Sequence, residues 1–140
     1  MTVKYADVEG GSEIPKEIYR VTRVDLVRYA GASGDFNDIH WSDRAARTVG
    51  LPGVIAHGMY TMAQAGKFVT DWVGDLGAIT EFSVRFSSMI PVPDDDQGVT
   101  IEVGGTVTEK LGDNKVAVDI VVRSGGTKVL TRSRAVVRLP

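Results

Sequence analysis

Residues 58–73 read GMYTMAQAGKFVTDWV and carry the strongest helical pattern in the chain. Apolar and small residues recur along this stretch at steps of three and four: Met59, Met62, Ala63, Gly66, Val69 and Val73. This spacing places them on one face of a helix. Most of the remaining positions are also apolar, and a helix that is apolar on most sides is surrounded by other structure. The stretch therefore predicts a helix at the centre of the fold.

Strand-like segments follow this helix and fill the rest of the chain. Residues 79–90 alternate apolar side chains such as Phe82, Val84 and Phe86 with polar neighbours, which is the period of a half-buried strand. Three more strands are predicted at residues 99–109, 116–123 and 128–139, separated by turns at 111–114 and 124–126. Strands joined by such short turns pair in antiparallel fashion.

Smaller elements are predicted before the central helix. They are an arm at residues 1–16, a strand at 17–21, a helix from 23 to Gly31 or Gly34, and a helix at 43–49. Thr22 and Ser42 precede the two helices and have hydroxyl groups that cap a helix N-terminus. Asp25 adds a carboxylate to the first turn of the first helix. Helices on one side of an antiparallel sheet make an α+β fold, with the sheet curled around the central helix.

The composition is typical of one globular domain over residues 1–140. Hydrophobic residues make up 43% of the chain and charged residues 24%, which excludes a disordered chain. The chain has 16 basic and 18 acidic residues without a long basic run, so we expect no nucleic-acid partner. It has no cysteine, which excludes disulfides, thiolate metal ligands and a cysteine nucleophile.

The N-terminal residues lack the apolar core of a signal peptide and carry acidic residues early. No stretch approaches the ~18 consecutive apolar residues of a membrane-spanning helix. The sequence therefore predicts a cytoplasmic protein without a membrane span.

Candidate chemistry lies between the small helices and the central helix, where both histidines stand. Asp35 and His40 belong to an irregular loop with Gly34 and Asn37, two residue types that tolerate left-handed backbone angles. A carboxylate can accept a hydrogen bond from water, and an imidazole can give or take a proton at neutral pH. Together they can hold a water molecule and move protons. A capping aspartate and a structural histidine would show the same spacing.

His57 and Gly58 stand at the predicted start of the central helix. A free first-turn amide at Gly58 would lie at the positive end of the helix dipole, which suits a carbonyl or oxyanion. Close packing at Gly58 and capping by His57 are the alternative interpretations. Asp35, His40 and His57 also make a two-histidine, one-carboxylate set, but their spacing is not a sharp metal signature, so we expect no metal site.

The run YAGASGDFNDIH at residues 29–40, with Ala45 five residues on, resembles the signature of the MaoC-like family of R-specific enoyl-thioester hydratases. The run IAHGM at residues 55–59 is similar to the second recurrent motif of that family. Further segments resemble the catalytic subunit of mycobacterial-type (3R)-hydroxyacyl-ACP dehydratases: 49–51, 56–59, 69–70, 72–75, 84–86 and 91–93. The resemblance covers nearly the whole chain and implies a hot-dog fold, an antiparallel sheet wrapped around one long helix.

The resemblance also implies an activity: reversible syn hydration and dehydration between (3R)-hydroxyacyl and trans-2-enoyl thioesters in fatty-acid metabolism. Asp35 and His40 would form the catalytic dyad, and the backbone N–H of Gly58 would bind the thioester carbonyl. Asn37 and His57 would shape or support the site. No cofactor is implied, because CoA or the phosphopantetheine of an acyl carrier protein is part of the substrate. The implied assembly is a homodimer, or a heterodimer with a non-catalytic hot-dog sister subunit.

One residue departs from the family pattern. Asp38 stands where the family usually has proline, which loosens the loop and adds a carboxylate near His40. Two other functions share the fold: an acyl-thioester hydrolase and a non-catalytic acyl-binding subunit. The retained aspartate and histidine favour the hydratase over both.

Overall fold

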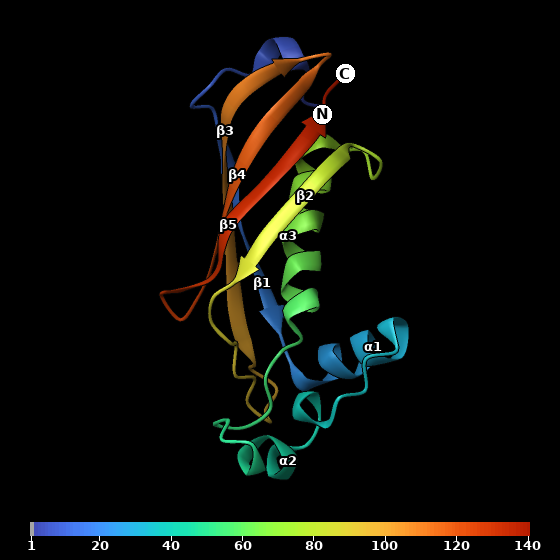
Figure 1. The fold of residues 1–140 in the computed structure, drawn as a ribbon, viewed down its shortest axis with the longest axis vertical. Helices are drawn as coiled ribbons and strands as arrows, with labels where there is room; N and C mark the ends of the chain where they lie inside the picture. Colours follow the sequence, from blue (N-terminus) through green and yellow to red (C-terminus); the bar gives the residue numbers. More distant parts are fainter. Residues whose placement is uncertain (1) are drawn as a thin grey trace.

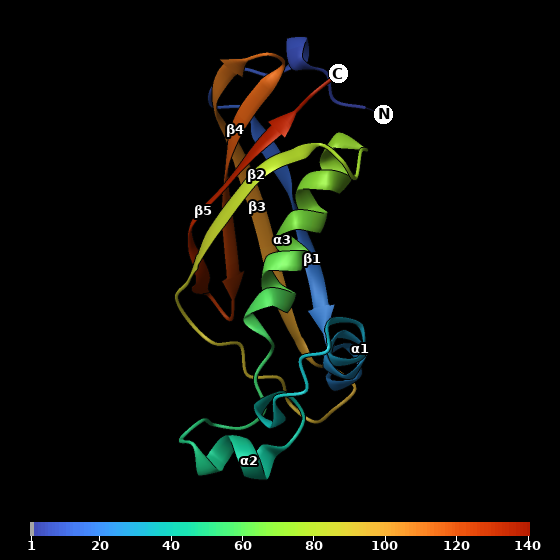
Figure 2. The ribbon, with the colours of Figure 1, turned by 45° about the vertical axis from the view of Figure 1, so that its right-hand side comes forward.

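One antiparallel sheet and one long helix make up most of the computed structural model, which describes residues 2–140 (Figure 1). The strands are β1 (Glu13–Val21), β2 (Ile79–Phe86), β3 (Val99–Gly112), β4 (Lys115–Ser124) and β5 (Thr127–Arg138). Their order across the sheet is β1-β3-β4-β5-β2, so β1 and β2 are its two edges. The helix α3 (Gly58–Val73) runs along one face of the sheet (Figures 1 and 2). This arrangement confirms the predicted α+β hot-dog fold.

The smaller helices lie at the end of the molecule where α3 begins (Figures 1 and 2). They are α1 (Arg23–Ser33), the one-turn 3-10 helix η2 (Asp38–His40) and α2 (Asp43–Thr48). Another 3-10 turn, η1 (Tyr5–Asp7), lies at the opposite end. Within residues 2–140, no helix is both long and apolar enough to cross a membrane.

The cap of α2 follows the sequence prediction, since the hydroxyl of Ser42 accepts a hydrogen bond from the N–H of Ala45 at 3.1 Å. At α1 the hydroxyl of Thr22 makes no cap hydrogen bond to the backbone, and the cap is provided by Asp25. The carboxylate of Asp25 accepts hydrogen bonds from the N–H of Thr22 at 2.8 Å and from its hydroxyl at 3.1 Å. Gly34 ends α1 with a φ of 77°, a left-handed conformation that glycine adopts without steric cost. α2 begins after Ser42 as predicted, and it ends at Thr48, one residue earlier than expected.

Strand boundaries differ from the prediction at tight turns and edges. β1 begins at Glu13, inside the predicted arm, and runs through Pro15 with a register shift against β3. An edge strand accommodates proline because part of its N–H row faces away from the sheet. The turn between β3 and β4 is narrower than predicted, because Asp113 and Asn114 with φ of 58° and 56° are compatible with a two-residue hairpin turn.

β2 is shorter than predicted and ends at Phe86 rather than Ile90. The N–H groups of Ser87 and Ser88 both donate to the single carbonyl of Val129, at 3.0 and 3.3 Å. Two donors on one acceptor cannot continue a regular antiparallel ladder. The segment after β2 therefore leaves the strand geometry close to the first turn of α3.

The sheet covers one side of α3. The buried residues of the helix are Tyr60, Thr61, Ala65, Phe68, Val69 and Val73. Phe68 is thus a core residue, whereas Met59 is 54% exposed and Ala63 is also exposed. The sequence predicted that α3 is covered on most sides. The sheet covers one side only, because the chain has a single sheet to pack against the helix. An apolar stripe of α3 remains uncovered.

Candidate active site

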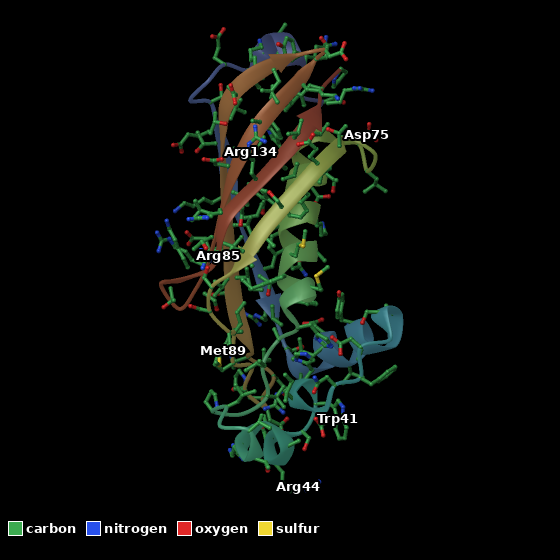
Figure 3. The ribbon with its side chains drawn as sticks, viewed as in Figure 1. Trp41, Arg44, Asp75, Arg85, Met89 and Arg134 are labelled. Atoms are coloured by element: carbon green, nitrogen blue, oxygen red, sulfur yellow. The ribbon has the colours of Figure 1, made fainter. Side chains whose placement is uncertain are left out.

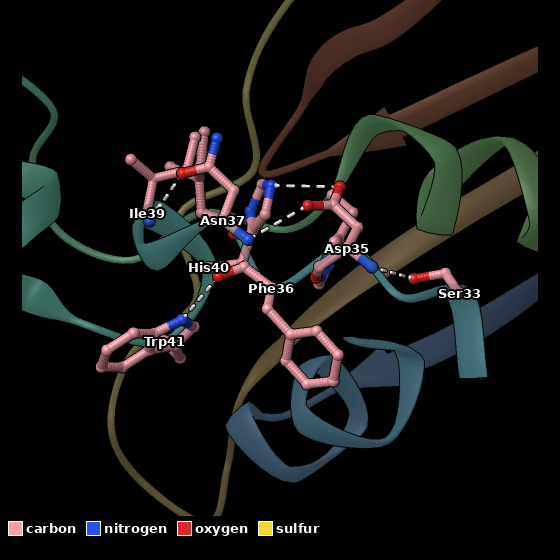
Figure 4. A network of polar contacts seen from close by, with 9 residues as sticks. Ser33, Asp35, Phe36, Asn37, Ile39, His40 and Trp41 are labelled. Carbon is pink, nitrogen blue, oxygen red and sulfur yellow. Dashed lines mark hydrogen bonds and ion pairs between the residues drawn. The ribbon is translucent and has the colours of Figure 1, made fainter. Parts of the chain in front are cut away.

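The loop between α1 and α2 is held by its own short polar side chains (Figure 4). The hydroxyl of Ser33 accepts a hydrogen bond from the N–H of Asp35 at 3.2 Å, and the carboxylate of Asp35 accepts one from the N–H of Asn37 at 3.2 Å. The amide oxygen of Asn37 in turn accepts from the N–H of Ile39 at 3.3 Å. Such side-chain turns fix an irregular backbone. Asn37 therefore takes part in two of the hydrogen bonds that fix this loop.

His40 faces Asp35 with one ring nitrogen and the backbone with the other. Its Nδ1 lies 2.7 Å from the carbonyl oxygen of Ile55, and a carbonyl can only accept, so Nδ1 carries the hydrogen. Its Nε2 lies 4.0 Å from Oδ2 of Asp35 (Figure 4). In the neutral ring this Nε2 has a free lone pair. The His40 side chain is 8% exposed and that of Asp35 48%, so solvent reaches the pair from the Asp35 side.

His57 packs behind the pair and contacts both of its members. Its Nε2 lies 3.1 Å from the backbone oxygen of Asp35 and donates to it. Its ring stacks on His40 with centroids 3.9 Å apart and planes inclined by 22°. The edge of Tyr29 meets it from another side, with centroids 4.8 Å apart. His57 is therefore placed to support the pair from behind.

The pKa of His57 is lowered, chiefly because burial disfavours its charged form. The hydrogen bond to the Asp35 carbonyl raises this pKa, while the neighbouring His40 lowers it further. Only 1% of the residue is exposed. His57 is therefore a neutral ring at physiological pH and an unsuitable proton carrier.

The three side chains do not fit one metal ion, although their candidate ligand atoms all lie within 4.8 Å of one another. A bound metal lies ~2.0–2.1 Å from an imidazole nitrogen, along its in-plane lone pair. The planes of His40 and His57 are stacked, so their in-plane lone pairs lie in two nearly parallel planes and do not converge on one ion. The hydrogen bonds to Ile55 and Asp35 also occupy one nitrogen of each ring.

Gly58 begins α3 beside this pair. Its N–H is one of the first-turn donors without an intrahelical acceptor, and it lies at the positive end of the helix dipole. A cavity of about 160 Å³, which we call the Gly58 cavity, opens next to it. The lining residues are Ile55, Ala56, Gly58, Thr61, Phe86, Ser88, Met89, Ile90, Val129 and Leu130. Met89 lies at the same end of the molecule as Trp41 of the loop (Figure 3).

The structure brings together all five residues singled out in the sequence: Asp35, Asn37, His40, His57 and Gly58. Asp38, the departure from the family pattern, begins η2, and its backbone carbonyl accepts from Trp41 and Ser42 at 3.2 and 2.8 Å. The loop is therefore well hydrogen-bonded without proline.

Two features of the site were missed. The carbonyl of Ile55 orients His40 through the backbone, which leaves no side-chain signal in the sequence. Phe86 reaches the site from a distant strand.

Acidification should destabilise the protein in part through His57. Because the folded pKa is lowered below the ordinary 6.5, the unfolded chain binds a proton more readily than the folded one. The neutral His57 ring makes its full contribution to stability above pH 6.5. This contribution is lost as the pH falls toward the pKa of His57 in the folded protein. Urea unfolding should show a larger loss of free energy from about pH 7.5 to about pH 5.5 in the parent than in His57→Gln. An equal loss in both proteins would contradict this assignment.

Known proteins similar to this chain include dehydratases and hydratases. The "3-hydroxyacyl-thioester dehydratase X" of Mycobacterium tuberculosis is 37% identical over 79 residues, which are 56% of this chain and 27% of that protein. A solved "MaoC-like dehydratase" superposes with a TM-score of 0.93 at 38% identity, over 99% of this chain and 43% of the other. The R-hydratase PhaJ1 of Pseudomonas aeruginosa superposes with a TM-score of 0.86 at 26% identity, over 99% of this chain and 86% of the other.

The matched residues span about a quarter of the length of the mycobacterial relative, and this chain covers less than half of the solved MaoC-like chain. The family model for the MaoC-like domain matches residues 8–124, which include the loop, the start of α3 and most of the sheet. These residues contain both sequence motifs that carry the resemblance. The chain belongs to the MaoC-like domain family.

Proposed function

We propose that this protein catalyses the reversible syn hydration and dehydration between trans-2-enoyl and (3R)-hydroxyacyl thioesters of CoA or acyl carrier protein. One observation carries the proposal: the Asp35 carboxylate faces His40 Nε2 across 4.0 Å, beside the amide of Gly58 and an apolar cavity. The names of the mycobacterial and Pseudomonas relatives support the same class of reaction.

In the dehydration direction, the N–H of Gly58 donates to the thioester carbonyl oxygen and stabilises the enolate-like charge that develops there. His40 Nε2 takes the proton from C2, with its ring held by the hydrogen bond to Ile55. Asp35 accepts a hydrogen bond from the C3 hydroxyl and stabilises the positive charge that forms on His40.

His40 Nε2 then gives this proton to the C3 hydroxyl, the C3–O bond breaks to release water, and the electron pair left on C2 forms the C2–C3 double bond. Both side chains approach the substrate from one side, so the elimination is syn. Hydration runs through the same steps in reverse, with the pair holding the attacking water. The proposed reaction needs only the transfer of a proton and the loss or addition of water. It therefore uses no metal or redox cofactor.

The activity is tested with crotonyl-CoA. The enoyl absorbance should fall to an equilibrium value without release of free thiol, and dialysis against a chelator should leave the rate unchanged. Thiol release at the rate of absorbance loss would indicate the hydrolase, and no change in either signal would indicate a non-catalytic subunit. Loss of activity on metal removal would contradict the proton-transfer mechanism.

The proposed assembly is a dimer of hot-dog units. The outer edge of β2 presents unpaired backbone groups, which proteins usually cover. The adjacent face of α3 exposes Met59 and Ala63, with Met62 partly covered. A second unit joined along this edge would cover both surfaces, and Gly58 would lie close to the junction.

Sedimentation of the purified chain should give about twice its 15.1 kDa at micromolar concentration, because a standard interface is large enough for a stable dimer. A homodimer is expected, since the chain carries its own dyad. A sister chain without the dyad is the alternative partner. A monomer that is fully active at that concentration would contradict the shared interface. A matched variant, Met59→Lys, should shift the equilibrium toward monomer, whereas Leu76→Lys, at another exposed apolar position, should not.

A further inference from the structure

We infer that the ring of Phe86 limits the length of the acyl chain that the site accepts, so that the substrates carry short and medium acyl chains. The inference rests on the proposed function, because it assigns the acyl group to the Gly58 cavity. It concerns specificity and gives Phe86 no part in proton transfer.

Phe86 lies directly against the start of α3. A Cβ atom placed on Gly58 would lie 3.0 Å from two carbons of the Phe86 ring, closer than an ordinary contact. Phe86 is the last residue of β2 and pairs with Leu130 of β5, and both residues line the Gly58 cavity. Phe86 is also 52% exposed, so its ring lies at the rim of this cavity and is not packed in the core.

The size and lining of the cavity fit a short apolar chain. Of its lining residues only Thr61 and Ser88 have polar side chains. Its volume is about 160 Å³, and an apolar cavity of ~150 Å³ holds a six-carbon molecule such as benzene. With the thioester carbonyl at Gly58, the cavity should hold roughly six further carbons of the acyl chain. Phe86 is the one aromatic side chain in this lining, and we take its ring as the wall that a longer chain meets.

Phe82 provides a matched control in the same strand. It packs on the same helix in the same manner, with a ring carbon 3.6 Å from the Cβ position of Gly66. It lies outside the set of residues that line the Gly58 cavity. Truncation of Phe82 therefore removes a similar ring from the contact between β2 and α3 and leaves the cavity wall in place.

The test compares kcat/KM for butenoyl-, octenoyl- and dodecenoyl-CoA in the parent, Phe86→Ala and Phe82→Ala. In the parent, dodecenoyl-CoA should be at least tenfold poorer than octenoyl-CoA. Phe86→Ala should raise the dodecenoyl-to-butenoyl ratio by about 10- to 100-fold, the range of steric discrimination in an apolar pocket. Phe82→Ala should leave the ratio within about threefold of the parent. If Phe86→Ala fails to fold, Phe86→Leu should show a smaller shift in the same direction.

Equal turnover of all three substrates by the parent, or the same ratio in both variants, would overturn the inference. Calorimetric binding of butanoyl- and dodecanoyl-CoA separates it from the proposed function, because binding requires no turnover. If the parent hydrates no enoyl thioester but Phe86→Ala still strengthens dodecanoyl-CoA binding relative to butanoyl-CoA, the reaction is wrong and the length limit stands. If hydration occurs and Phe86→Ala changes neither the dodecenoyl-to-butenoyl ratio of kcat/KM nor the dodecanoyl-to-butanoyl ratio of affinities, the length limit is wrong.

Discussion

Asp35→Asn and His40→Ala should each lower kcat/KM for crotonyl-CoA by about 10²- to 10⁴-fold, the range for a lost acid–base group. Asparagine keeps the size of the aspartate and removes the charge that would face the protonated imidazole across 4.0 Å. Alanine at position 40 removes the nitrogen that takes the C2 proton. The measurement is the initial rate of enoyl absorbance loss at low substrate concentration.

Asp38→Asn is the matched control, since it neutralises an exposed carboxylate of the same loop that makes no ion pair with His40 among the described residues. It should stay within about fivefold of the parent, as expected for a group outside the proton path. Circular dichroism melts should show that Asp35→Asn keeps the fold, because the loop lies outside the hydrophobic core. A rate within about threefold of the parent in Asp35→Asn or His40→Ala would contradict the dyad.

Gly58→Pro should lower kcat by about 10²- to 10³-fold, the cost of removing one oxyanion donor. Proline lacks the N–H group that would bind the thioester carbonyl, yet the first position of a helix tolerates proline well. The preceding residue, His57, has φ of −59° and ψ of 135°, angles that a residue before proline adopts readily. The substitution therefore removes the donor with little strain on the backbone.

Gly58→Ala is the control for the added carbon atoms. It keeps the N–H but brings a Cβ within 3.0 Å of the Phe86 ring, so the ring must move by only a few tenths of an ångström. Its kcat should fall by less than about tenfold, as expected when the donor remains. Equal losses in the alanine and proline variants would show that crowding, and not the N–H, explains the effect.

Local patterns predicted most of the fold. The bounds of α3 match the expected residues, since Gly58 and Gly74 bracket a long apolar repeat. The covering of α3 was harder to predict, because periodicity reports which residues avoid water and not what covers them. Met59 and Tyr60 are equally apolar in the sequence, but only Tyr60 faces the sheet.

The candidate site was predictable where residues lie close in sequence and carry distinctive chemistry. Asp35 and His40 share one loop, so their proximity follows from the turns that Asn37 and its neighbours form. The stacking of His57 on His40 depends on how the start of α3 packs against that loop. The position of Phe86 depends on sheet order, which places β2 at an edge beside α3. Such long-range contacts have no local sequence signal.

The most direct measurement is the product formed from crotonyl-CoA in D₂O. Syn addition by Asp35 and His40 should give (3R)-3-hydroxybutanoyl-CoA with a single deuterium at C2, on the same face as the new hydroxyl group, as shown by NMR and chiral chromatography. A (3S) product, anti addition, or crotonate with free CoA would contradict hydration by this pair.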